Sequence, residues 1–150
     1  MAGGMTPTAD GDAPHEPGRM SLIETLQKRL PAFPAHLGMT YVEATRDRIV
    51  AELTVREDHS NGLGTMHGGA LMAFADTLGA VATILNIPPD AKTTTLESKT
   101  NFIAGAPVGA RLVGEVTPLH RGRRTQIWET RISTTDGKLV AKVTQTQMVL

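Results

Sequence analysis

A single carboxylate, that of Asp76, interrupts a run of apolar and small residues that extends from Gly68 to Leu85. A helix that is apolar on every side lies buried, either in a protein core or in a bilayer. A carboxylate in such surroundings can attack a carbonyl carbon directly or take a proton from a water molecule. It can also be a buried polar group that neighbouring backbone or hydroxyl groups satisfy. Asp76 is therefore the first candidate for chemistry.

His67, Gly68 and Gly69 stand where this apolar run begins. The first turn of a helix carries N–H groups without helical partners and the positive end of the helix dipole, which together stabilise negative charge on a carbonyl oxygen. Glycine has no Cβ, so its backbone can approach a bound molecule closely. The alternative is a helix start that needs glycine only for tight packing. His67 fits a positioning residue at the joint between loop and helix better than a base.

The element that must position these groups is the helix itself, which we expect over residues 67–87. Pro88 and Pro89 end it, because proline lacks the N–H that a helix interior needs. A membrane span does not fit: the run is at the short limit for a span, carries a carboxylate at mid-depth, and has no flanking basic residues. The sequence therefore predicts a helix buried in a protein core.

Two strand patterns precede this helix and four follow it. Ser21 and Glu24 have the spacing of a capping box for a short N-terminal helix, which Pro31 and Pro34 end. Short links between consecutive strands favour antiparallel pairing, and a helix that is apolar all round needs a sheet to surround it. We therefore expect an α+β fold in which a curved antiparallel sheet wraps around one long central helix. The expected strands are residues 39–44, 48–55, 93–103, 110–119, 125–134 and 138–150.

The chain of 150 residues is neutral, with 15 basic and 15 acidic side chains and no cysteine. Neutrality argues against nucleic acid or an anionic membrane as a partner. The lack of cysteine excludes disulfides and a cysteine nucleophile, and it is compatible with the cytoplasm, where we place the protein because no signal-peptide pattern is present. Residues 1–19 lack apolar anchors and predict a disordered tail, which leaves residues 20–150 as a single domain.

The stretch from Asn61 to Gly69, Asn-Gly-Leu-Gly-Thr-Met-His-Gly-Gly, is followed at a fixed distance by Asp76. This pattern resembles a motif of the hotdog-fold acyl-CoA thioesterases, most closely that of the small single-domain, PaaI-like branch, which includes the phenylacetyl-CoA-pathway enzymes. A histidine followed by two glycines is a weak signal alone, but its spacing from the asparagine and the aspartate makes the resemblance specific. The resemblance covers residues 36–150 and includes residues 95–102, residues 120–126 and the threonine-rich closing strand.

The resemblance implies the hotdog fold, a sheet wrapped around the central helix, for residues 20–150. It also implies that two subunits pair into a continuous sheet, and that a homotetramer of two such dimers is the usual assembly. The implied reaction is hydrolysis of an acyl-CoA thioester to a free carboxylic acid and CoA. The implied chemistry uses no metal and no cofactor, since CoA is part of the substrate.

The same resemblance gives roles to the residues of the motif. Asp76 becomes the nucleophile or the general base, and the N–H of Gly68 becomes the oxyanion donor. Asn61 matches a position whose side chain helps to hold the water or the carbonyl, although an ordinary Asn-Gly turn explains it equally well. Thr95 matches a hydroxyl residue that hydrogen-bonds near the carboxylate, and Thr94 takes its place if the alignment shifts by one. The implied catalytic set is Asp76, Gly68, Asn61, His67 and Thr95.

A basic cluster from His120 to Arg124 stands out in this neutral chain. Similar stretches in the resembling family lie near the nucleotide end of CoA, and arginine suits phosphate because it forms forked hydrogen bonds. The alternative is a solvated hairpin turn. The implied substrate-binding residues are Gly69, Lys99, Arg123, Arg124 and Thr125.

Gly68 and Asp76 are eight residues apart, which is about 12 Å along a helix. Two groups at that distance cannot serve one carbonyl, so we expect them to come from different subunits and the active site to lie at a dimer interface. Two other functions fit the same fold. One is a hotdog hydratase or dehydratase, in which His67 would have to be the base, and the other is a non-catalytic acyl-CoA-binding protein.

Overall fold

The computed structural model describes residues 20–150, and the predicted tail of residues 1–19 lies outside this range. Two short helices and two strands lead to one long helix, and four strands follow it, which confirms the expected α+β order. The elements are α1 (Leu22–Lys28), α2 (Ala32–His36), β1 (Thr40–Ala44), β2 (Ile49–Thr54), η1 (Glu57–His59), α3 (Gly68–Ile84), β3 (Thr93–Phe102), β4 (Arg111–Arg121), β5 (Thr125–Thr134) and β6 (Leu139–Val149).

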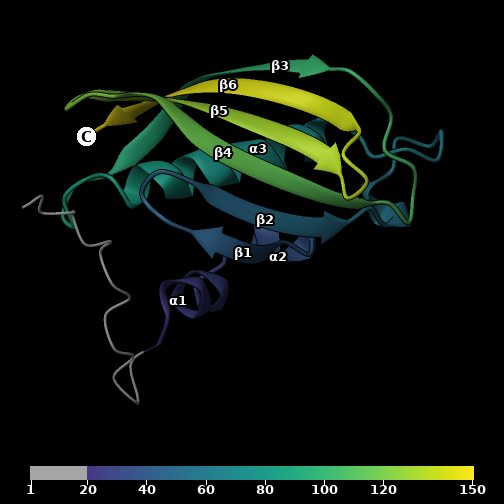
Figure 1. Cartoon of the computed structure of the whole chain (residues 1–150), viewed down its shortest axis with the longest axis horizontal. Helices are drawn as coiled ribbons and strands as arrows, with labels where there is room; N and C mark the ends of the chain where they lie inside the picture. The colour runs from purple at the N-terminus through teal and green to yellow at the C-terminus, as the bar shows by residue number, and fades with distance from the viewer. Residues whose placement is uncertain (1–19) are drawn as a thin grey trace, which may run out of the picture.

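The strands form one antiparallel sheet in the order β1-β2-β4-β5-β6-β3, and the sheet curves around α3 (Figure 1). β4, β5 and β6 are neighbours in the chain and in the sheet, as their short links predict. β3 instead pairs with β6 at the sheet edge, with Thr95 opposite Gln147. The outer edge of β3 pairs with no strand of residues 20–150.

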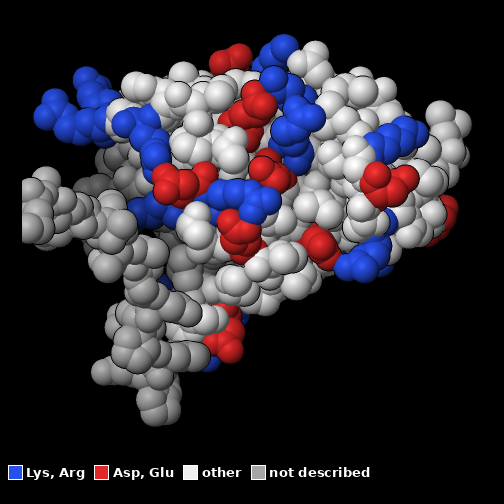
Figure 2. All heavy atoms as spheres, in the orientation of Figure 1, with Lys and Arg blue, Asp and Glu red and all other residues white. Residues whose placement is uncertain are grey.

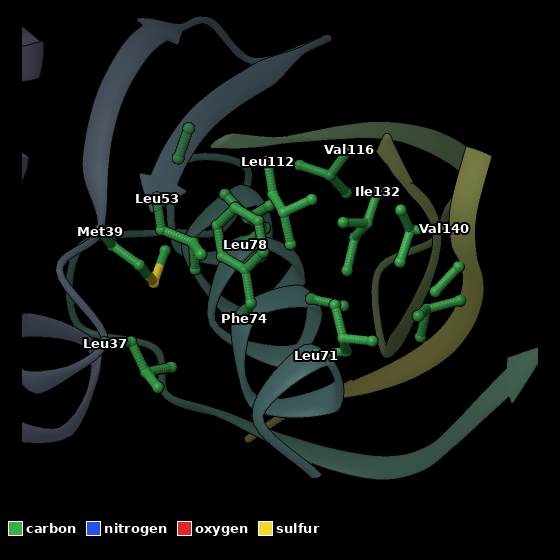
Figure 3. Packing of buried hydrophobic residues seen from close by; sticks show 14 of the residues in the cluster. Leu37, Met39, Leu53, Leu71, Phe74, Leu78, Leu112, Val116, Ile132 and Val140 are labelled. Carbon is green, nitrogen blue, oxygen red and sulfur yellow. The ribbon is translucent and has the colours of Figure 1, made fainter. Parts of the chain in front are cut away.

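The hydrophobic core lies between the concave face of the sheet and α3 (Figure 3). Phe74 and Leu78 project from α3, are fully buried, and lie in one cluster with Leu112 of β4. Gly114 allows this close approach, because a Cβ there would lie 2.7 Å from Leu78 Cδ1 and 2.8 Å from the Phe74 ring. Protein interiors pack as densely as organic crystals, so these contacts fix the rotation of α3 and the direction in which Asp76 points.

Helix α3 ends earlier than predicted, at Ile84 rather than near residue 87. The Asn86 N–H bonds to the Thr83 carbonyl at 2.8 Å, and the Asn86 side chain donates to the Ala82 carbonyl at 2.9 Å. These bonds tighten the last turn and satisfy a terminal carbonyl before the two prolines are reached. No helix within residues 20–150 is long and apolar enough to cross a membrane.

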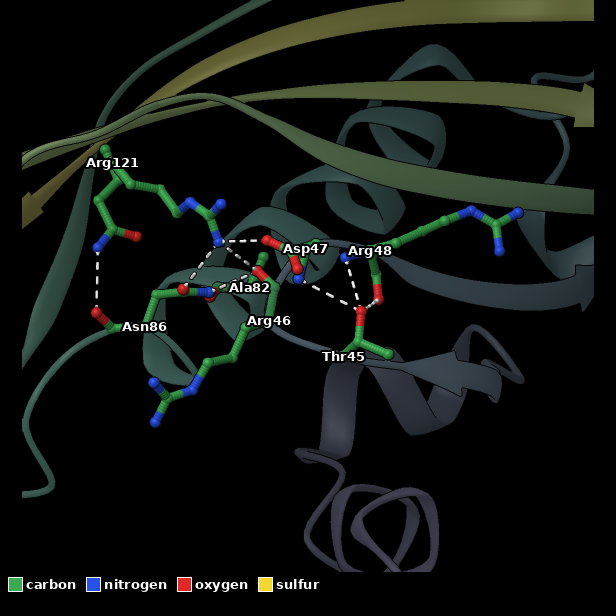
Figure 4. A network of polar contacts seen from close by, with 8 residues as sticks. Thr45, Arg46, Asp47, Arg48, Ala82, Asn86 and Arg121 are labelled. Atoms are coloured by element: carbon green, nitrogen blue, oxygen red, sulfur yellow. Dashed lines mark hydrogen bonds and ion pairs between the residues drawn. The ribbon is translucent and has the colours of Figure 1, made fainter. Parts of the chain in front are cut away.

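Polar contacts connect the C-terminal end of α3 to the β1–β2 turn and to the end of β4 (Figure 4). Arg121, at the end of β4, pairs with Asp47 at 2.7 Å and donates to the Arg46 carbonyl at 3.1 Å. The Asn86 side chain donates to the same carbonyl at 2.9 Å. The β1–β2 turn, the end of β4 and the end of α3 are therefore held as one unit.

The N-terminal helices partly match the prediction. α1 has the expected capping box, in which the Glu24 N–H donates to Ser21 Oγ at 3.2 Å and the Ser21 N–H donates to the Glu24 carboxylate at 2.7 Å. The prolines that were expected only to end a helix belong to a second one: Pro31 is the N-cap of α2 and Pro34 lies in its first turn. A first-turn residue has no helical partner for its N–H, so proline costs no hydrogen bond there.

The outer face of the sheet carries charges of both signs (Figure 2). Arg48 pairs with Glu43 and, at 2.9 Å, with Glu115, and Lys142 pairs with Glu129 at 2.8 Å. The hydrogen bond from Arg48 lowers the pKa of the Glu115 carboxyl. In Figure 2, basic and acidic side chains are mixed over the middle of this face, and basic side chains gather at its upper left end.

Candidate active site

The Asp76 carboxylate leaves α3 toward β3 and β6 and is half-buried. Its Oδ1 accepts a hydrogen bond of 2.7 Å from the Thr95 hydroxyl and one of 3.2 Å from the Gln145 side-chain amide. No residue of the range 20–150 donates to its Oδ2. One carboxylate oxygen is thus held by the protein, and the other can meet a water molecule or a carbonyl carbon, as a base or nucleophile requires.

Strand alternation decides which threonine reaches the carboxylate. Thr95 lies on the inner face of β3, whereas Thr94 points the other way and is exposed. A register shift between Thr95 and Glu97 then changes which later residues of β3 face inward. The structure therefore places Thr95, and not Thr94, against Asp76, while a catalytic role for Thr95 stays a prediction.

The first turn of α3 leaves one N–H group available. His67 is the N-cap, and its Nδ1 accepts the Gly69 N–H at 2.9 Å, while its carbonyl accepts the Ala70 N–H at 2.9 Å. An imidazole nitrogen that accepts a hydrogen bond carries no proton, so the neutral ring holds its proton on Nε2. The Gly68 N–H has no acceptor among residues 20–150. It can donate a hydrogen bond to a bound acceptor, while its role as an oxyanion donor stays a prediction.

A pocket of about 360 Å³ borders this N-terminus. Gly68 lies in its wall with Asn61 and Phe102, and apolar side chains such as Leu71 complete it. A Cβ at position 68 would lie 3.1 Å from the Phe102 ring, so glycine lets the aromatic ring approach the helix start. This volume is at the lower end of the range for small-molecule pockets.

The Asn61 side chain is engaged within its own loop. Its Oδ1 accepts the Leu63 N–H at 2.9 Å and its Nδ2 donates to Thr65 Oγ1 at 3.0 Å. This is the geometry of an Asx turn, one of the two interpretations that the sequence left open. Asn61 nevertheless lines the pocket beside Gly68, so a role in holding water or a carbonyl stays a prediction.

The predicted CoA-binding residues lie far from Gly68 in the same chain. Arg123, Arg124 and Thr125 are at the β4–β5 turn, next to the end of α3 that Arg121 contacts. Both turn arginines are exposed and pair with no carboxylate of residues 20–150. Helix α3 has 17 residues and is therefore about 25 Å long, and Gly68 is at its other end.

The other two predicted substrate contacts are also constrained. Lys99 is exposed on β3 and donates to Asn101 at 2.8 Å. The Gly69 N–H is taken by His67, so the backbone of Gly69 has no free donor for a substrate. Within residues 20–150, no group of three histidine, aspartate or glutamate side chains is arranged to hold a metal ion.

The structure thus assembles two partial sites. One contains Asp76 and Thr95, and the other contains Gly68 and Asn61. Asp76 and Gly68 lie on one helix, eight residues apart, or about 12 Å along its axis. Within one subunit, this distance is too long for both groups to contact the same carbonyl.

Sequence reasoning missed Gln145 and Gln147, which are buried beside Asp76 and Thr95. A signal was present: the closing strand reads Thr-Gln-Thr-Gln at residues 144–147, and the two glutamines follow Val143 on the inward-facing positions. Long uncharged amides at core positions indicate that a polar partner faces them.

A curved antiparallel sheet around one long helix defines the hotdog fold, and solved structures confirm it. A thioesterase from Haemophilus influenzae superposes with a TM-score of 0.80 and 26% identity, over 88% of this chain and 92% of that one. The Escherichia coli PaaI protein from the phenylacetic acid degradation operon superposes with a TM-score of 0.77 and 21% identity, over 85% and 91% of the two chains.

Sequence similarity then gives the family. The thioesterase superfamily profile matches residues 63–141. The 1,4-dihydroxy-2-naphthoyl-CoA hydrolase of E. coli K12 is 32% identical over 104 residues, which are 69% of this chain and 76% of that protein. The chain belongs to the thioesterase superfamily, as the motif around His67 predicts, and it is a thioester hydrolase.

Proposed function

We propose that the protein hydrolyses acyl-CoA thioesters to a carboxylic acid and CoA. The observation that carries this proposal is the Asp76 carboxylate, whose Oδ1 is held at 2.7 Å by Thr95 while its Oδ2 has no partner within residues 20–150. The N–H of Gly68, unpaired in the same range, supplies the matching oxyanion donor. A carboxylate and an oxyanion donor are the two groups that acyl transfer to water needs.

In the proposed reaction, Asp76 acts by one of two routes. As a general base it takes a proton from water while the water oxygen attacks the thioester carbon, and as a nucleophile it attacks that carbon itself to form an anhydride, which water then cleaves. In both routes the carbonyl oxygen becomes negative and accepts the Gly68 N–H. The tetrahedral adduct then collapses with cleavage of the C–S bond, which gives the free acid in the first route and the anhydride, before water cleaves it, in the second. In both routes the CoA sulfur leaves as a thiolate and takes up a proton. No metal or cofactor takes part.

Two subunits form the proposed site. The outer edge of β3 pairs with no strand of residues 20–150, and Leu96, Phe102 and Ile103 at this edge are more than half exposed, at 57%, 55% and 54%. An unpaired edge with exposed apolar side chains is a template for another strand. We propose that two β3 strands pair across a twofold axis and bring Asp76 of one subunit to Gly68 of the other, and that two such dimers form a tetramer.

The substrate proposal has independent support. The E. coli relative is named for a hydroxylated aromatic acyl-CoA, which favours aromatic acyl groups, with medium-chain groups as the alternative. Arg123 and Arg124, without carboxylate partners in residues 20–150, are free to bind the CoA phosphates. A sequence without cysteine fits a reducing compartment, so we place the reaction in the cytoplasm.

The test is the release of free CoA from benzoyl-, phenylacetyl-, hydroxybenzoyl- and medium-chain acyl-CoA, compared between wild type and Asp76→Ala. Light scattering verifies that both proteins have the same assembly. We expect turnover by the wild type and a loss of about a hundredfold or more in the variant. Binding without thiol release would contradict hydrolysis and favour an acyl-CoA-binding protein. Loss of enoyl absorbance without thiol release would favour a hydratase.

A further inference from the structure

We propose that Gln145 is a positioning residue that holds the Asp76 carboxylate in its reactive orientation, and that Gly79 is required to admit it. The inference rests on the hydrolysis at Asp76 proposed above. The Gln145 Nε2 lies 3.2 Å from Asp76 Oδ1 and 3.4 Å from the Asp76 carbonyl oxygen. The side chain thus reaches from β6 to both the backbone and the carboxylate of one helical residue.

The close approach of Gln145 depends on Gly79. A Cβ on residue 79 would lie 2.3 Å from Gln145 Cδ and 2.5 Å from both of its terminal atoms. Residue 79 lies in the interior of α3, where glycine forms a helix less well than alanine does. The glycine therefore lowers the intrinsic stability of the helix at the position where the Gln145 amide touches it.

The chemistry of its neighbours fixes which end of the Gln145 amide faces α3. Both Asp76 oxygens that it meets are acceptors, so the NH₂ group must point toward them. The Gln145 Oε1 is then buried and has no partner among residues 20–150. An unpaired buried acceptor costs stability, and a methionine or leucine would fill the space without that cost. The donor N–H toward Asp76 is the feature that only the amide supplies.

A second chain of hydrogen bonds also ends on Asp76 Oδ1. The Thr93 hydroxyl lies 2.9 Å from Gln147 Oε1 and 3.0 Å from the Met148 carbonyl oxygen, and Gln147 Nε2 donates to Thr95 Oγ1 at 2.7 Å. Thr95 has only one hydroxyl hydrogen, and since its oxygen is accepting from Gln147, that hydrogen goes to Asp76 at 2.7 Å. Two donors from two strands thus converge on Oδ1, and rotation of the carboxylate breaks both bonds. Oδ2 is kept as the reacting atom.

The first experiment compares Gln145→Met with Gln126→Met, using full-length protein and the best acyl-CoA of the panel. Gln126 is a matched control, since it is also buried on the inner face of the sheet but its amide donates to the Asn86 carbonyl, at 3.4 Å. We expect Gln145→Met to lower kcat about ten- to hundredfold with little change in KM, because it removes a hydrogen bond to a charged group. Gln126→Met keeps its kcat.

A double-mutant cycle tests the partnership of the two residues. Gly79→Ala displaces the Gln145 side chain and is expected to lower kcat about as much as Gln145→Ala does. In the combined variant, the methyl group added at position 79 occupies space that the glutamine has left, so the double variant is no slower than Gln145→Ala alone. Losses that multiply would overturn the role of Gly79. If Gln145→Met does not fold, this cycle tests the positioning role of Gln145 in its place.

The outcomes separate this inference from the function on which it rests. If Asp76→Ala is inactive while Gln145→Met and Gly79→Ala keep the wild-type kcat, hydrolysis at Asp76 stands and the positioning role is wrong. If Gln126→Met falls as far as Gln145→Met, the effect is one of packing and the positioning role is again wrong. If the wild type releases no CoA from any thioester, both proposals fall together.

Discussion

The Thr95 hydroxyl and the Asp76 carboxylate join the edge strand β3 to the central helix through a hydrogen bond of 2.7 Å. Because β3 is also the proposed subunit edge, this contact ties the carboxylate to the strand that meets the partner. Thr95→Val keeps the shape of the side chain and removes the donor, so we expect kcat to fall about tenfold or more. Thr95→Ser restores most of the rate. Equal rates for the two variants would show that the hydroxyl is not needed.

The oxyanion role of Gly68 can be tested with proline. Residue 68 is the first residue of α3, where proline is well tolerated, and His67 has the extended backbone (φ −62°, ψ 135°) that a following proline prefers. Gly68→Pro therefore removes the N–H while keeping the helix, and we expect a loss of about a hundred- to a thousandfold in kcat.

Gly68→Ala is the matched control, since it adds a similar Cβ near Phe102 but keeps the N–H. Steady-state kinetics on both variants, with circular dichroism for helix content, separate the donor from the added bulk. If the alanine variant is as slow as the proline variant, the loss comes from contact with the Phe102 ring and not from the missing donor.

Mixed assemblies test whether Gly68 and Asp76 act across the subunit interface. Co-expression of Gly68→Pro and Asp76→Ala chains gives heterodimers with one doubly damaged site and one intact site. The isolated heterodimer should then have about half of the wild-type rate, and the unseparated random mixture about one quarter, although both parents are inactive. The measurement is CoA release by the doubly tagged heterodimer fraction. A heterodimer as inactive as its parents would place both groups in a single chain.

The β4–β5 turn is expected to bind the CoA phosphates. Arg123→Ala/Arg124→Ala should raise KM several-fold with little change in kcat, because it removes charge that lies far from the thioester. Raising the ionic strength should raise the KM of the wild type toward that of the double variant, because salt screens the attraction between arginine and phosphate. Lys28→Ala/Arg29→Ala, with the same change of charge at the exposed end of α1, is the control. An equal KM for all three proteins would favour a solvated turn.

Alkaline stability depends on Tyr41. Burial raises the pKa of Tyr41 to about 12, whereas an unfolded tyrosine titrates near 10. The folded state therefore holds the phenol proton more tightly, so this contribution to stability is complete below about pH 10 and is lost as the pH rises toward about 12. Tyr41→Phe cannot titrate, so its urea midpoint should decline less between about pH 9 and about pH 11 than that of the wild type. If the urea midpoints of the two proteins fall by the same amount over this range, Tyr41 does not contribute to the pH dependence of stability.

The sequence was most informative where local rules decide the structure. The alternation of Ile49, Ala51 and Leu53, the capping box at Ser21, and the all-apolar run around Asp76 each predicted an element that the structure contains. The end of α3 was predicted too late, because Asn86 closes the last turn before the prolines. Helix α2 was missed, because prolines that end one helix also begin another.

By itself, the sequence determined the kind of protein. Its motif from Asn61 to Asp76 resembles that of the thioesterases, and its periodicities predicted a sheet around one helix. Only the tertiary structure decided which side chains meet the carboxylate. It placed β3 beside β6, so that Thr95, Gln145 and Gln147 converge on one helical residue. Consecutive strands usually pair, but β3 pairs with β6, and the residue pattern of one strand alone does not identify its partner.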